Sequence, residues 1–307
     1  MTPAISVAGL TRRYHDQVAL DNVTVEIEAG SVTGLLGRNG AGKTTLLRIL
    51  AGQEFPSSGT VSVLGEPPAE NEHVLRRMIL VREDQAYPDI KVGHALRAAS
   101  WFYPNWDATL ADSLIADFGL GPGKAVKKLS RGQRSALGIT IGLAARAEVT
   151  LFDEPYAGLD AVAREIFYDR LLADYAERPR TIVLSTHLID EAAALFENVV
   201  VIDRGRVVLE AAADGLRGVA TTVSGPVLAV DEFTAGRPAW DRRSLGSQAS
   251  VVTVGQLDEA DRARARSLGL DLVPLTLQQL VVHAADWPAA PQPASFPPAA
   301  AMEGASA

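Results

Sequence analysis

Cysteine is absent from this 307-residue sequence, which excludes disulfide frameworks and thiolate metal sites. Long apolar runs are also missing, because the most apolar stretch, residues 139–152, is interrupted by Arg146 and Glu148. No run reaches the roughly 18 apolar residues that a membrane-spanning helix needs. The amino terminus has no basic segment followed by an apolar run, so we expect no secretory signal and a protein that stays in the cytosol.

An excess of positive charge is missing as well. The formal net charge is −8, whereas proteins that bind the phosphate backbone of nucleic acids usually carry a basic surface. Five histidines occur without a close pair at zinc-site spacing. We therefore expect no nucleic-acid partner and no structural metal.

Short β-branched runs alternate with helical patterns along the first two thirds of the chain, which predicts an α/β fold. The runs near residues 32, 149 and 181 are almost continuously apolar, as in central strands that are covered on both faces. Helical spacing dominates between about residues 92 and 145, which predicts a helical subdomain inserted into the sheet domain. We expect a main domain over 1–219 with its helical subdomain at about 88–145, a small accessory region over 220–286, and a disordered Pro/Ala-rich tail over 287–307.

The strongest motif is GRNGAGKT, residues 37–44, which follows a predicted strand and precedes a predicted helix. Such a P-loop wraps its backbone N–H groups around phosphates, and the helix amino terminus adds positive potential. Lys43 supplies a charge to the outer phosphates, and the Thr44 hydroxyl suits Mg²⁺. The predicted ATP-binding residues here are Gly37, Arg38, Asn39, Gly40, Ala41, Gly42, Lys43, Thr44 and Thr45.

A second motif, LSRGQ at residues 129–133, precedes a predicted helix. Here the chain resembles the ABC transporter ATPases, whose signature LSGGQ is followed by a helix. The resemblance implies that Ser130, Arg131, Gly132 and Gln133 contact a nucleotide held by the P-loop of another molecule. Arg131 stands where the family carries a glycine.

Further family motifs follow in the expected order. The apolar run 149–152 ends in Asp153 and Glu154; the resemblance implies that Asp153 supports Mg²⁺ and that Glu154 is the general base for the attacking water. Asp160 closes a match to the D-loop, and His187 ends a strand as the switch histidine of the family does.

Two assignments leave alternatives open. Tyr14 stands where the family places an aromatic side chain against adenine, although a half-buried surface tyrosine would look the same. The glutamine that senses Mg²⁺ and water in the family should follow the strand at residues 78–81. Gln85 keeps the amide and is the favoured candidate for this catalytic and metal-binding role, whereas Glu83 lies at the ungapped distance from the strand.

The resemblance implies a P-loop NTPase fold of ABC type, with a mixed sheet core, an inserted helical subdomain and a small C-terminal accessory region. It also implies an ATPase subunit that binds ATP and Mg²⁺ and works as a head-to-tail homodimer or heterodimer. Such a subunit drives a separate transmembrane permease and lies at the inner face of the cell membrane, with membrane contact only through that permease. The segment TLQQL at residues 276–280 resembles the end of ABC-2-type export ATPases and favours an exporter.

Two other functions fit part of the pattern. A soluble ABC ATPase that acts on ribosomes or DNA is one, but such proteins usually carry two nucleotide domains or long coiled coils, and this sequence has neither. A nucleotide sensor with little hydrolysis is the other. The pair Asp153 and Glu154, together with His187, argues against it.

Overall fold

The computed structural model describes residues 3–216 and 218–283. Its largest sheet has six strands in the order β5-β6-β7-β3-β8-β9, parallel except for β9. The strands are β3 (Val32–Leu36), β5 (Met78–Arg82), β6 (Val149–Asp153), β7 (Thr181–Thr186), β8 (Asn198–Asp203) and β9 (Arg206–Ala212). Every residue of β3, β6 and β7 is buried, so the three nearly continuous apolar runs are central strands, as predicted.

A second sheet covers one face of the first. It is antiparallel, in the order β2-β1-β4, and consists of β1 (Pro3–Tyr14), β2 (Gln17–Glu28) and β4 (Ser58–Val63). Helix α1 (Lys43–Leu50) shares one apolar core with both sheets, in which Leu47 and Leu151 are completely buried. This packing fixes the amino terminus of α1 at the carboxyl ends of the parallel strands, where ligands bind in α/β folds.

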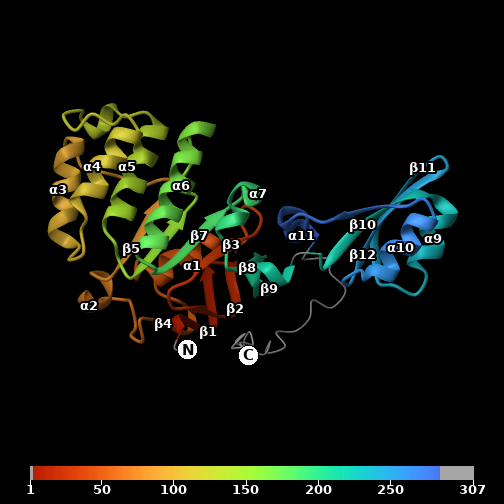
Figure 1. Ribbon diagram of the computed structural model, residues 1–307. Coiled ribbons are helices and arrows are strands. Elements are labelled where there is room, and N and C mark those ends of the chain that lie inside the picture. Colours follow the sequence, from red (N-terminus) through yellow and green to blue (C-terminus); the bar gives the residue numbers. More distant parts are fainter. Residues whose placement is uncertain (1–2, 217, 284–307) are drawn as a thin grey trace, which may run out of the picture.

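Helices fill the other face and the upper part of the molecule (Figure 1). Helix α2 (Glu72–Leu75) precedes β5. Between β5 and β6 lie three helices and a short 3₁₀ helix: α3 (Val92–Phe102), α4 (Ala108–Asp117), η1 (Val126–Lys128) and α5 (Arg131–Ala144). The helices after β6 are α6 (Ala161–Glu177), α7 (Ile189–Ala192), η2 (Ala193–Leu195) and α8 (Ala213–Leu216). The mixed sheet core with helices inserted between β5 and β6 is the fold that the sequence predicted.

A buried charge network ties these helices to the sheet. Arg146, which follows α5, contacts Asp107 before α4 and Asp174 on α6, at 3.1 Å each. Asp174 also pairs with Arg180 beside β7 at 2.6 Å. Because Arg146, Asp174 and Arg180 are all buried, each charge depends on the others to offset its lost hydration.

Residues 220–283, here called the C-terminal unit, form a separate sheet in the order β11-β12-β10-β13, antiparallel throughout. Its elements are β10 (Ala220–Pro226), α9 (Val227–Thr234), β11 (Ala239–Leu245), β12 (Gln248–Val254), α10 (Glu259–Ser267), β13 (Asp271–Pro274) and α11 (Leu277–His283). The first six follow the βαββαβ pattern of ferredoxin-like folds. The sequence predicts these residues only as one small accessory region.

The C-terminal unit meets the rest of the chain through α11. Leu280 and Val281 are buried in the same apolar core as Ile189 of α7, and the Gln278 N–H donates to the Asp190 carboxylate at 3.3 Å. Figure 1 shows α11 between α7 and the sheet of the C-terminal unit. The unit therefore contacts the short helix that begins two residues after His187.

None of the helices within the described ranges is both long and apolar enough to cross a bilayer. The tail predicted over 287–307 lies outside the described residues.

Candidate functional site

The P-loop runs from the end of β3 to the start of α1, and its glycines are required by backbone geometry. Gly37, Gly40 and Gly42 have φ values of 147°, 79° and 112°, in the region that side chains other than hydrogen disfavour. A Cβ atom at Gly37 would lie 2.1 Å from the Ile202 carbonyl oxygen, and one at Gly42 would lie 2.6 Å from that of Ala19. The loop therefore packs tightly against β8 and β2, with no room for a side chain at Gly37 or Gly42.

Lys43, the first residue of α1, folds back over this loop. Its ammonium group donates to the Gly37 carbonyl at 2.7 Å and to that of Arg38 at 3.2 Å. Burial lowers the pKa of Lys43, and the negative charges of Glu154 and Asp153 oppose that shift. The side-chain nitrogen of Lys43 is thus held beside the loop, where an outer phosphate would accept its hydrogen bonds.

Asp153 ends β6 next to Thr44. Burial raises the pKa of Asp153, and the Thr44 hydroxyl and the Lys43 ammonium only partly offset that rise. Its Oδ1 atom is buried and finds no hydrogen-bond partner among the described residues. A hydroxyl and an unpartnered carboxylate oxygen are the donors that Mg²⁺ prefers, so these residues fit the predicted metal.

Glu154 is held by a small hydrogen-bonded network. Its Oε2 atom accepts from the Tyr156 hydroxyl at 2.5 Å and lies 2.6 Å from Nδ1 of His187. The Tyr156 hydroxyl also contacts the Thr186 hydroxyl and accepts the His187 N–H at 3.2 Å. The second carboxylate oxygen, Oε1, is buried and has no partner among the described residues, which leaves it able to accept from a water.

Tyr156 was not among the residues that the sequence singled out. It is buried, and burial raises the pKa of its hydroxyl far above the usual range, so it stays a hydrogen-bond donor. Its position two residues after Glu154 is the only signal in the sequence, and aromatic side chains at such positions usually pack in a core. Only the folded chain brings its hydroxyl to both Glu154 and His187.

These groups border one pocket of about 490 Å³, here called the P-loop pocket. Its lining consists of Tyr14, Gln17, Ala19, Asn39, Gly40, Ala41, Gly42, Lys43, Thr44, Thr45, Glu83, Asp153 and Glu154. Tyr14 lies at this pocket, with its hydroxyl bonded to Glu54 and the Arg12 guanidinium 4.5 Å from its ring centre. Gln17 and Ala19 were missed, because nothing in their side chains signals phosphate chemistry.

The candidates Glu83 and Gln85 separate in the structure. The Glu83 N–H donates to the Asp153 carbonyl at 3.2 Å, which holds Glu83 at the pocket wall. Gln85 does not line the pocket; its Oε1 atom is buried near α5, 3.8 Å from where a Cβ on Gly138 would lie. Glu83 therefore lines the P-loop pocket, whereas the Gln85 side chain lies toward α5, and which of the two senses Mg²⁺ stays a prediction.

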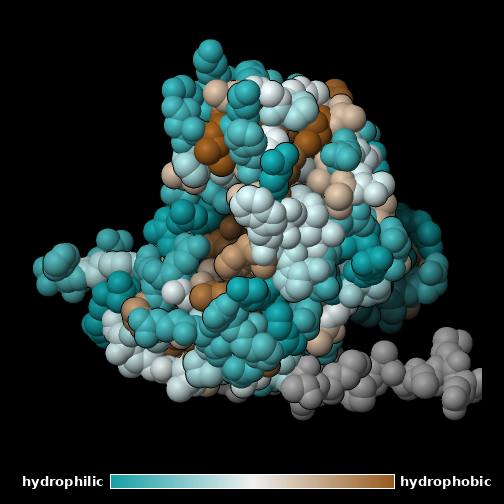
Figure 2. Space-filling view, turned by 90° about the vertical axis from the view of Figure 1, so that its left-hand side faces the viewer, coloured by the Kyte–Doolittle hydropathy of each residue, from teal (hydrophilic) through white to brown (hydrophobic). Residues whose placement is uncertain are grey.

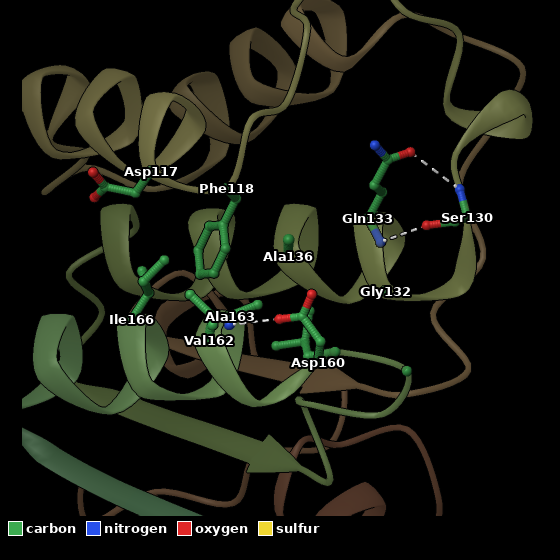
Figure 3. A pocket seen from close by; sticks show the side chains of 12 residues that line it. Asp117, Phe118, Ser130, Gly132, Gln133, Ala136, Asp160, Val162, Ala163 and Ile166 are labelled. Carbon is green, nitrogen blue, oxygen red and sulfur yellow. Dashed lines mark hydrogen bonds between the residues drawn. The ribbon is translucent and has the colours of Figure 1, made fainter.

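The LSRGQ segment forms a different pocket, about 310 Å³ in volume (Figure 3). Ser130 caps α5 by accepting from the Gln133 N–H at 3.2 Å, while Gln133 Oε1 accepts from the Ser130 N–H at 3.3 Å. Asp160 caps α6 across this pocket, accepting from the Ala163 N–H at 2.9 Å. A Cβ on Gly132 would lie 2.3 Å from the Gly158 carbonyl oxygen, so the segment packs directly on the D-loop.

The two pockets of one chain have no lining residue in common. The pocket at the LSRGQ segment, here called the signature pocket, is lined by Ser130, Gly132, Gln133 and Asp160 among others. The P-loop pocket is lined by Lys43, Thr44 and the carboxylates. A single chain therefore places the P-loop and Ser130 in separate pockets.

A strand, a P-loop, a lysine and two carboxylates in this arrangement define a P-loop nucleotide-binding protein. Comparison with known proteins narrows the class. Residues 20–157 match the family model described as ABC transporter.

Curated relatives agree with the family model. The chain is 36% identical over 212 residues to "Nod factor export ATP-binding protein I" of Ralstonia nicotianae, covering 67% of this chain and 66% of that protein. It is also 36% identical over 221 residues to "Phosphonates import ATP-binding protein PhnC 1" of Natronomonas pharaonis, covering 69% and 95%. A solved "Structure of ATP binding subunit of ABC transporter" superposes with a TM-score of 0.63 at 26% identity, over 70% of this chain and 92% of that one.

The chain therefore belongs to the family of ABC transporter ATP-binding subunits, whose members hydrolyse ATP coupled to transport.

Proposed function

We propose that this chain is the MgATP-hydrolysing subunit of an ABC exporter, and that two such subunits close head-to-tail around their nucleotides. One observation carries the proposal: the P-loop pocket and the signature pocket of one chain are separate. Ser130 and Gly132 lie at a helix amino terminus, which favours phosphate, but they do not face the P-loop of their own chain. A second subunit, identical or related, would supply the missing half.

The pocket residues then have distinct roles. Lys43 binds the outer phosphates, and Tyr14 contacts the base at the pocket edge. Thr44, Asp153 and Glu83 would hold Mg²⁺, which when bound supplies positive charge to the phosphate oxygens. Glu154 orients the attacking water through its unpartnered Oε1 atom, while Tyr156 and His187 hold Oε2. This division of one carboxylate between two tasks supports Glu154 as the general base.

The permease contact is proposed on the helical part. Trp101 and Phe102 at the end of α3 keep 77% and 45% of their surface exposed. Figure 2 looks onto this side of the molecule and shows apolar patches on its upper, helical part. Exposed aromatic side chains are enriched where proteins bind partners. Membrane contact would thus be indirect, from the cytoplasmic side.

The direction of transport is proposed from relatives. Several similar curated proteins are Nod factor export ATP-binding proteins, although a phosphonate import protein is equally similar. The TLQQL segment at residues 276–280, which resembles the end of ABC-2-type export ATPases, supports export. We propose that residues 1–219 are the motor and that 220–286 are accessory.

Substitutions at Ser130 test the head-to-tail arrangement. Ser130→Asp keeps a good helix cap but adds a negative charge where a phosphate of the second subunit would lie. In a Glu154→Gln background with MgATP, light scattering should show a dimer for the parent and a monomer for Ser130→Asp. Ser130→Asn, which keeps the cap without charge, is the matched control and should dimerise.

If Ser130→Asp dimerises and hydrolyses ATP as well as Ser130→Asn, the head-to-tail site is wrong. The direction of transport is tested separately, by reconstituting the subunit in vesicles with the permease encoded beside it. Uptake into inside-out vesicles with external ATP supports export, and loss of preloaded cargo from them supports import.

A further inference from the structure

Two residues that depart from the family pattern form an ion pair with each other. Glu83 lies at the ungapped distance from β5 at which the glutamine of the family would stand, and Arg131 replaces a glycine of the signature. The Arg131 guanidinium pairs with the Glu83 carboxylate, although 47 residues separate them in the chain. The pair joins the loop after β5 to the start of α5.

Each partner belongs to a different pocket region. Glu83 lines the P-loop pocket beside Asp153 and Glu154. Arg131 lies in the signature segment between Ser130 and Gly132, and its side chain is 63% exposed. Its stem passes the D-loop, since a Cβ on Gly158 would lie 3.0 Å from Arg131 Cγ. The ion pair is thus a direct link from the nucleotide pocket to the signature segment of the same chain.

Charge explains why the pair is needed. With Glu83 unpaired, three carboxylates would face a pocket whose lining contains one lysine. A triphosphate adds further negative charge, so an uncompensated Glu83 would repel it. A glutamine at position 83 would create no such cost. Arg131 supplies the compensating charge that an amide does not require.

We propose that Arg131 is a positioning residue for Glu83: it neutralises this carboxylate in the free chain and releases it when Mg²⁺ enters with the nucleotide. The Glu83 carboxylate then exchanges the Arg131 guanidinium for Mg²⁺, and the Arg131 side chain becomes free beside Ser130. This inference rests on the proposed function, because it assumes that the P-loop pocket binds MgATP. It predicts that the effect of Arg131 on binding changes sign with Mg²⁺.

A double-mutant cycle measured by calorimetry tests the exchange, at protein concentrations where light scattering shows monomers. The variants are Arg131→Met, which keeps an aliphatic stem, Glu83→Gln, and the two combined. In EDTA, Arg131→Met should weaken ATP binding about 2–5-fold, the size expected for an exposed ion pair. With Mg²⁺ the same change should tighten binding by a similar factor, because the carboxylate is already free for the metal.

In the Glu83→Gln background, Arg131→Met should leave the affinity for ATP unchanged, both in EDTA and with Mg²⁺. Arg134→Met removes an exposed arginine one turn further along α5 and is the control for charge alone. Equal effects of Arg131→Met in both backgrounds, or the same sign with and without Mg²⁺, would overturn the proposal. Failure of the unchanged chain to bind MgATP would instead contradict the proposed function.

Discussion

The P-loop pocket and the C-terminal unit differ in the kind of side chain that they gather. The pocket gathers Lys43 and three carboxylates within one cavity, whereas the core of the C-terminal unit is formed by apolar side chains such as Val223, Phe233 and Leu270. Charged groups held close together act on one another strongly, so single substitutions in the pocket should change chemistry. Substitutions in the C-terminal unit should change packing. The following experiments test that contrast.

Glu154→Gln should have the largest effect. Loss of the general base lowers turnover by about 10²–10⁴-fold, while Lys43 and the P-loop still bind ATP. Phosphate release and calorimetry measure the two quantities. Full turnover in this variant would show that another group activates the water.

Asp174→Ala should be the most destabilising change near the helices. It leaves Arg146 and Arg180 buried without their shared carboxylate, at a cost of about 3–5 kcal/mol in unfolding free energy. Urea denaturation measures the loss. Asp169→Ala, an exposed carboxylate on the same helix, is the control and should be nearly neutral; equal losses would mean that the network contributes nothing specific.

Tyr156→Phe should lower kcat about 10-fold, the value of a hydrogen bond to a charged group, with little change in the KM for ATP. The ring stays in place, and only the hydroxyl that holds Glu154 Oε2 is lost. Tyr168→Phe is matched to it, because the Tyr168 hydroxyl is buried without a partner among the described residues. A similar kcat for both variants would remove Tyr156 from the site.

Asp153→Asn should stabilise the nucleotide-free chain while it impairs hydrolysis. Because burial raises the pKa of Asp153, the folded state favours its protonated form. The stability linked to this group is present below its unfolded pKa and is lost as the pH rises through the folded value. At pH 7 the substitution removes that penalty, and we expect Tm to rise by about 2–4 °C. A rise of the same size at pH 3 would contradict this cause.

Leu280→Ala should have the smallest effect on catalysis. Leu280 is buried against the α7 region, so its truncation loosens the C-terminal unit by about 2–5 kcal/mol. Hydrogen exchange over residues 220–283 should increase, while turnover changes by less than about 2-fold because the carboxylates keep their partners. A collapse of turnover would mean that α11 positions His187 through α7.

The sequence alone determined the P-loop, the order of the motifs and the central strands. Glycines with positive φ, a lysine and paired acids have few alternative uses, and strands buried on both faces require continuous apolar runs. The βαββαβ order of the C-terminal unit was not predicted, because β11 and β13 contain no buried residue and the unit carries no motif.

Tertiary structure alone decided which side chains meet. It separated Glu83 from Gln85 by the direction of one turn, paired Glu83 with Arg131, and brought the Tyr156 hydroxyl to Glu154. Contacts between residues far apart in the chain depend on how helices and sheets pack, and local pattern contains no record of that packing.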